Sequence, residues 1–224
     1  MRGLFVTGTG TGVGKTIVSA ALLGAMGASG EPVRAYKPVV TGLAEEPGEW
    51  PPDHELLALA AGMSPEQVAP MRFGPAVSPH LAGSLAHEPI DAVTLVENAR
   101  VTAGAGKTLI VEGVGGLLVP LADNFTVRDL AVELGLPLVI AGSPGLGTIN
   151  HTLLTIEAAR SAALDVAAVV LTPWPKEPSP MERSNRETIA RLGTVEVAVL
   201  REISNAGIAE LASAGERLPW RGWL

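Results

Sequence analysis

Four glycines lie within ten residues near the start of the chain, and they limit what the chain can fold into. Residues 7–16 read TGTGTGVGKT and directly follow the apolar run Leu4-Phe5-Val6. Glycine is costly to order, so such a cluster indicates a backbone that adopts unusual conformations or approaches another group closely. A short strand, a glycine-rich turn and then Lys15-Thr16 at the start of a helix together predict a phosphate-binding loop. In such a loop the lysine reaches the terminal phosphates and the threonine hydroxyl ligates magnesium.

The spacing of the glycines distinguishes this loop from the commoner patterns. The usual phosphate loop, G-x-x-x-x-G-K-[ST], would place a glycine at position 9, where this chain has Thr9. The preceding glycine is Gly8, so the loop is one residue longer. The dinucleotide pattern G-x-G-x-x-G also fails, because the glycines recur at every second residue and Lys-Thr follows them.

The rest of the chain alternates between short apolar segments and segments typical of helices. We expect strands at residues 4–7, 33–36, 108–112, 138–141, 166–171 and 195–200. We expect helices at residues 16–29, 53–62, 90–103, 126–134, 148–163, 180–192 and 206–214, with Asp53 as an N-cap. Residues 41–52 form a Gly- and Pro-rich loop, and residues 65–89 are mostly irregular. Strands that are apolar throughout predict a mostly parallel sheet with helices on both faces, in a single α/β domain of the P-loop NTPase fold over residues 1–224.

Composition excludes several classes of protein. The chain has 224 residues, of which 47% are hydrophobic, and a net charge of −7. It has no run of Lys or Arg, so we expect no nucleic-acid partner. No apolar run approaches the ~18 residues that cross a membrane, and the apolar start is too short for a signal peptide. The absence of cysteine excludes disulfides and thiol catalysis and fits a cytoplasmic protein.

Five motifs together resemble the dethiobiotin synthetase family. They are VTGTGTGVGKT from residue 6, YKPVVTG from residue 36, VSPHLA from residue 77, VEGVGGLLVPL from residue 111 and GLGTINHTLLT from residue 145. They occur in the order and spacing of that family, and the extra residue in the loop is itself a family trait. Val114 replaces the usual alanine, and the match is weaker beyond residue 155.

The resemblance implies an enzyme that closes a cyclic urea. Diaminopelargonic acid combines with carbon dioxide, supplied as CO2 or bicarbonate, to give a carbamate. ATP phosphorylates the carbamate, and the neighbouring amine then displaces phosphate. Two anions must meet in this step, so cations have to neutralise both of them.

The resemblance also assigns residues. Lys15, Lys37 and Thr11 are the catalytic residues, with Lys37 bridging carbamate and phosphate. Thr16, Asp53 and Glu112 are the magnesium ligands. The nucleotide contacts are Gly12, Val13, Gly14, Lys15, Thr16, Ile17, Asp53, Glu112, Gly113, Val114, Gly115, Thr172, Pro173, Arg201, Glu202 and Ile203.

The substrate contacts implied by the resemblance come from two subunits. Thr11, Lys37 and Thr41 bind the diamine or its carbamate. In a homodimer, the substrate carboxylate lies at the N-terminus of a helix of the partner subunit, which this sequence places at residues 145–150, including Gly147 and Asn150.

Recognition of the base is where this sequence departs from the family. Many members carry Asn just after the strand that corresponds to residues 166–171, and this chain has Thr172 near that place. A hydroxyl cannot supply the donor and acceptor pair of an amide. We therefore expect relaxed base selectivity, with another triphosphate such as CTP able to replace ATP.

Two other functions remain open at this point. The first is an ATP-dependent amide ligase like the cobyrinic-acid synthetases, but those usually carry a domain with a catalytic cysteine, and this chain has no cysteine. The second is an ATPase switch of the partition or cell-division type. Those proteins have a second lysine early in the loop, where this chain has Gly10.

Overall fold

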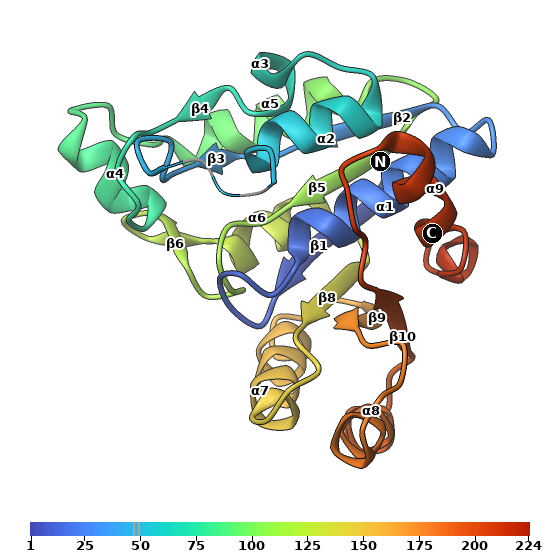
Figure 1. Cartoon of the computed structure of the whole chain (residues 1–224). Coiled ribbons are helices and arrows are strands. Elements are labelled where there is room, and N and C mark those ends of the chain that lie inside the picture. The colour runs from blue at the N-terminus through green and yellow to red at the C-terminus, as the bar shows by residue number, and fades with distance from the viewer. Residues whose placement is uncertain (47, 49) are drawn as a thin grey trace.

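Six parallel strands form the centre of the computed structural model, which describes residues 1–46, 48 and 50–224. The strands are β1 (Arg2–Gly8), β2 (Val33–Tyr36), β5 (Thr108–Glu112), β8 (Leu138–Gly142), β9 (Val166–Trp174) and β10 (Val197–Arg201). Their order in the sheet is β10-β9-β8-β1-β5-β2, and Figure 1 shows β2 at the top and β9 and β10 below. All pairs in this sheet are parallel, as predicted.

Helices cover both faces, because successive residues of each strand point to opposite sides. On one side, α1 (Lys15–Ala28), α2 (Asp53–Ala61) and α9 (Ile208–Gly215) pack on Leu4 and Val6 of β1. On the other side, α5 (Ala92–Ala103) and α6 (Val127–Leu134) pack on Phe5. Helices α7 (Thr148–Arg160) and α8 (Pro180–Gly193) continue that side under β8, β9 and β10. The predicted α/β class is confirmed.

The prediction that residues 65–89 are mostly irregular was wrong. This segment contains the short helices α3 (Pro65–Val68) and α4 (Pro79–Leu85), and β4 (Met71–Arg72). Each helix begins with a proline at its first position, where the missing N–H costs nothing. The strand β4 pairs with β3 (Val39–Val40), which follows β2 closely. In this segment, proline therefore occupies the first position of helices and does not only interrupt them.

Further elements complete the description. An antiparallel pair of short strands, β6 (Pro120–Ala122) and β7 (Phe125–Thr126), precedes α6, and a 3-10 turn spans Trp220–Gly222. Trp220 and Trp223 are buried against the cluster that contains α1 and α9, and the indole Nε1 of Trp223 donates to Glu196 Oε2 at 2.9 Å. Among the described residues, no helix has both the length and the apolar character to cross a membrane.

Several element ends differ from the sequence expectations. Asp53 is not an N-cap: Pro52 occupies that place, and Asp53 is the first helical residue, with its carboxylate directed elsewhere. Strand β9 extends to Trp174 because Trp174 still pairs with Arg201 of β10. Thr172 and Pro173 therefore lie within the strand and not after it. Helix α7 ends at Arg160, three residues before the predicted end.

Close backbone contact between α1 and α9 makes Gly215 intolerant of a side chain. A Cβ at Gly215 would lie 2.0 Å from the carbonyl oxygen of Ala21 and 2.9 Å from Ala25 Cβ. We expect Gly215→Ala to force the two helices apart and lower the free energy of unfolding by about 2 kcal/mol. Urea denaturation measures this change.

Gly27→Ala is the matched control for this prediction. Gly27 lies in α1, and a Cβ there meets nothing within 4 Å. Alanine has the higher helix propensity, so this variant should be as stable as the parent or more stable by up to about 1 kcal/mol. Equal effects of the two substitutions would contradict the proposed contact.

Candidate functional site

The candidate site lies where three adjacent strands end. Strand β1 leads into the glycine loop, β5 ends at Glu112, and Lys37 directly follows β2. These strands are neighbours in the order β1-β5-β2, so their carboxyl ends meet at one edge of the sheet. A cavity of about 700 Å³ opens at this edge, and residues of the loop, of α1 and of the segments after β2, β3 and β5 line it.

The glycines of the loop are required by its geometry. Gly12 and Gly14 have φ of +74° and +88°, a region that side chains rarely adopt. A Cβ at Gly8 would lie 2.7 Å from a methyl group of Val13, and one at Gly14 would lie 2.6 Å from the Thr172 methyl group. The loop therefore wraps tightly around the start of α1, and the N-terminus of that helix faces the cavity.

Lys15 is held within this loop. Its ammonium donates to the carbonyl oxygen of Gly10 at 2.8 Å. The pKa of Lys15 is lowered, chiefly because burial disfavours its charged form, while Glu112 opposes this effect and Lys37 adds to it. The Gly10 carbonyl oxygen thus occupies the position at the Lys15 ammonium where a phosphate oxygen can bind.

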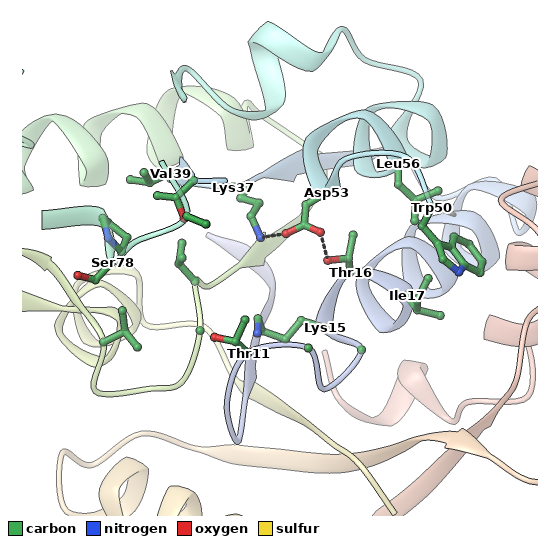
Figure 2. A pocket seen from close by; sticks show the side chains of 18 of the residues that line it. Thr11, Lys15, Thr16, Ile17, Lys37, Val39, Trp50, Asp53, Leu56 and Ser78 are labelled. Atoms are coloured by element: carbon green, nitrogen blue, oxygen red, sulfur yellow. Dashed lines mark hydrogen bonds and ion pairs between the residues drawn. The ribbon is translucent and has the colours of Figure 1, made fainter. Parts of the chain in front are cut away.

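Lys37 is the centre of a buried ionic cluster. It is 2% exposed, and its Nζ lies 2.7 Å from Asp53 Oδ2 and 2.5 Å from Glu112 Oε1. Glu112 is fully buried, whereas the Asp53 side chain is half-exposed toward the cavity. Thr16 Oγ1 joins the cluster at 2.8 Å from Asp53 Oδ1 and 2.9 Å from Glu112 Oε1. Figure 2 shows Lys37, Asp53 and Thr16 pointing toward one another above the loop.

The two carboxylates keep Lys37 charged. Burial alone would lower the pKa of Lys37, but the adjacent Glu112 and Asp53 carboxylates raise it above its usual value. Burial likewise acts to raise the pKa of Asp53, and Lys37 and the hydrogen bond from Thr16 bring it below the usual value. A charged Lys37 and an ionised Asp53 are therefore fixed at one edge of the cavity at neutral pH.

The oxygen atoms of this cluster fit a magnesium ion. Glu112 Oε2 is buried without a hydrogen-bond partner, a state that is costly unless a ligand completes it. The Thr16 hydroxyl lies within 3 Å of one oxygen of each carboxylate, and all three groups are hard oxygen donors. The described residues hold no group of three or more His, Cys, Asp or Glu side chains suited to a metal. Magnesium does not need one, because it usually takes one or two carboxylates and completes its shell with water and phosphate.

Many residues assigned from the sequence meet in this cavity. Those that line it are Thr11, Gly12, Gly14, Lys15, Thr16, Ile17, Lys37, Thr41, Asp53, Val114 and Gly115. Glu112 lies directly behind them through its contacts with Lys37 and Thr16. Val13 and Gly113 adjoin this group but do not line the cavity.

Other assigned residues do not line the cavity. They are Thr172, Pro173, Arg201, Glu202 and Ile203, assigned to the nucleotide, and Gly147 and Asn150, assigned to the substrate. Thr172 and Ile203 are buried, and the Thr172 methyl group packs under Gly14. Gly147 and Asn150 are exposed around the start of α7. The roles of these residues stay predictions.

Sequence reasoning missed part of the lining. The additional residues are Val39, Trp50, Pro51, Leu56, Ala76, Val77, Ser78, Pro79 and Val119. Residues 77–79 lie in a motif that carried the family resemblance, so that motif was the available signal. Nothing in the sequence pattern pointed to Trp50, which reaches the cavity only because α2 follows it directly. The loop prediction for residues 41–52 includes residues 47 and 49, which lie outside the described part of the chain.

The glycine loop, the buried lysine and the parallel sheet define a phosphate-loop nucleotide-binding protein. Residues 2–205 match a family described as "AAA domain". The chain also superposes on chloroplast FtsY from Physcomitrella patens with a TM-score of 0.50 and 14% identity, over 96% of this chain and 64% of that one. This likeness supports the fold.

Comparison with curated proteins narrows the class further. The chain is 44% identical to the ATP-dependent dethiobiotin synthetase of Anaeromyxobacter dehalogenans (strain 2CP-1 / ATCC BAA-258), with 86% of each chain covered. It is 40% identical to that of Mycobacterium marinum, over 96% of this chain and 91% of the relative. The chain belongs to the ATP-dependent dethiobiotin synthetase family. The partition ATPase and the amide ligase, which the sequence left open, are not favoured.

Glu112 should be essential for stability because it compensates a buried charge. We expect Glu112→Gln, which keeps the shape of the side chain, to lower the free energy of unfolding at pH 7 by about 3 kcal/mol. The remaining partner of Lys37, Asp53, is half-exposed and cannot replace a buried carboxylate. Urea denaturation measures the loss.

Glu66→Gln provides the control. Glu66 pairs with Arg72 at 3.3 Å on the surface, where ion pairs contribute little. This variant should unfold like the parent. A loss for Glu112→Gln no larger than that for Glu66→Gln would show that Lys37 does not depend on the buried carboxylate.

Proposed function

We propose that this protein is an ATP-dependent dethiobiotin synthetase, which closes the ureido ring from diaminopelargonic acid, carbon dioxide and a nucleoside triphosphate. The observation that carries the proposal is Lys37. Its protonated ammonium lies at the edge of a cavity whose other side is a phosphate loop. A cation fixed between the two ends of such a cavity suits a reaction that joins an anionic carbamate to a phosphate.

The proposed roles follow from the positions of the side chains. Backbone N–H groups of the loop, the N-terminus of α1 and Lys15 bind the phosphates. Lys37 neutralises the carbamate and the transferred phosphoryl group as they approach, so that the carbamate oxygen can attack the γ-phosphorus and release the nucleoside diphosphate. The second amine then attacks the carbonyl carbon, phosphate leaves and the ring closes. The products are dethiobiotin, a nucleoside diphosphate and phosphate.

Magnesium is proposed as the cofactor of this site. Thr16, Asp53 and Glu112 would hold it, because their oxygens already converge beside the phosphate loop. When bound, magnesium supplies positive charge to the phosphate oxygens.

The diamine is proposed to bind at the end of the cavity beyond Lys37. Val39, Val77 and Val119 offer apolar walls for its methylene chain, and Thr11 and Thr41 offer hydroxyl groups to its polar end. We also propose a homodimer in which residues 145–150 of a second subunit bind the substrate carboxylate. This would explain why Leu146 is 93% exposed beside the N-terminus of α7. The cytoplasm is the proposed location, since the reaction consumes nucleoside triphosphate.

Lys37→Ala should abolish synthesis. We expect phosphate release from magnesium–ATP with bicarbonate to depend on diaminopelargonic acid, and Lys37→Ala to lower kcat by at least about a hundredfold. The assay is steady-state phosphate release with and without the diamine. Release that ignores the diamine in the parent protein would contradict the proposed function.

Lys176→Ala is the matched control, because Lys176 is exposed on the connection between β9 and α8. It should keep the rate of the parent. If Lys37→Ala fails to fold, Lys37→Met is the second variant, since methionine fills most of the volume that alanine leaves empty. An active Lys37→Met enzyme would exclude the proposed role of the ammonium.

Base selectivity should be low. Thr172 lies at the place where many relatives carry an amide, and it is turned toward Gly14. We expect kcat/KM for ATP, CTP, GTP and UTP to agree within about tenfold, since no amide pair distinguishes the bases there. A strict preference for ATP in these steady-state rates would contradict this prediction.

A further inference from the structure

The cavity has a second apolar end that the proposed chemistry does not use. Trp50, Pro51 and Leu56 line it together with Ile17 of α1. Figure 2 shows the indole of Trp50 at this end, next to Ile17 and Leu56 and beyond Thr16. Trp50 is partly exposed, whereas the other three tryptophans of the chain, at positions 174, 220 and 223, are buried.

The order of the groups along the cavity indicates toward which end the nucleoside extends. In Figure 2, Ser78 and Val39 lie at one end, Lys37 and Lys15 in the middle, and Ile17 and Trp50 at the other end. In the proposed function the carbamate binds at Lys37, so phosphates held by Lys15 direct the transferred phosphoryl group toward Lys37. The nucleoside then extends the opposite way, past Thr16 toward Ile17 and Trp50.

Of the residues expected to contact the base, Pro173, Arg201 and Glu202 are exposed but do not line the cavity, and two are buried. Thr172 and Ile203 are 3% and 7% exposed, and neither lines the cavity. The Trp50 end offers what a base needs, since it combines a partly exposed indole that lines the cavity with aliphatic neighbours. Stacking of a base on an aromatic ring tolerates any base, because every base has a π face.

We propose that Trp50 is the stacking platform for the base of the bound nucleoside triphosphate. The side chain determines affinity for the nucleoside without distinguishing strongly between bases. The proposal takes the direction of the nucleotide from the proposed function, but its test measures nucleotide binding without diamine, so each can fail separately.

The test is tryptophan fluorescence with magnesium–ATP, magnesium–CTP or magnesium–tripolyphosphate, without diamine. We expect ATP and CTP to quench the emission and tripolyphosphate, which fills only the phosphate positions, to leave it unchanged. Trp50→Phe should lose the quenching and keep the affinity for ATP within about threefold, since phenylalanine still stacks. Equal quenching by tripolyphosphate would overturn the proposal, because Trp50 would then respond to the phosphates.

Trp50→Ala tests the contribution to affinity. We expect its Kd for ATP and CTP to rise about tenfold, the change that corresponds to ~1.4 kcal/mol, and its Kd for tripolyphosphate to stay constant. Leu192→Ala, at an exposed leucine of α8, is the control for a lost apolar side chain. Loss of tripolyphosphate binding in Trp50→Ala, or no loss of ATP binding, would overturn the proposal.

The outcomes separate this proposal from the proposed function. Quenching by nucleotides without diamine-dependent phosphate release would support Trp50 as a base platform and reject the synthetase. Diamine-dependent release with a fluorescence that nucleotides leave unchanged would support the synthetase and reject the role of Trp50.

Discussion

The buried ammonium of Lys37 is the interaction on which the site depends. A charge removed from water is very costly unless carboxylates lie against it, and here Glu112 and Asp53 do. These residues come from three elements, because Lys37 follows β2, Glu112 ends β5 and Asp53 begins α2. The ionic cluster therefore fixes the position of α2 and of the end of β5 relative to the phosphate loop.

The same oxygens serve both the fold and the proposed chemistry. Glu112 Oε1 and Asp53 neutralise Lys37, while Thr16 connects the cluster to the first turn of α1. The unpartnered Oε2 of Glu112 and the contact of Lys15 with Gly10 leave a set of groups that phosphate and magnesium can complete. Charged groups that are already held together in this way suit phosphoryl transfer, which depends on positioning and electrostatics.

The sequence predicted the central strands well and the short helices poorly. The central strands are apolar throughout and therefore conspicuous, and β2 and β5 were predicted with their observed bounds. The two short helices within residues 65–89 were missed because proline was interpreted as a helix breaker. Asp53 was predicted as a cap because local pattern cannot show that a carboxylate is drawn to a lysine 16 residues away.

The phosphate loop, the parallel α/β fold and the family could all be inferred from the sequence, since these depend on local spacing and on motifs in a fixed order. Lys15, Thr16, Lys37, Asp53 and Glu112 could be assigned in the same way. Which of these side chains touch is visible only in the folded chain, because strand order brings the ends of β2 and β5 together and α2 packs beside them. The tertiary structure also placed Trp50 on the cavity and Thr172 beneath the loop, as packing against α1 and Gly14 sets both positions.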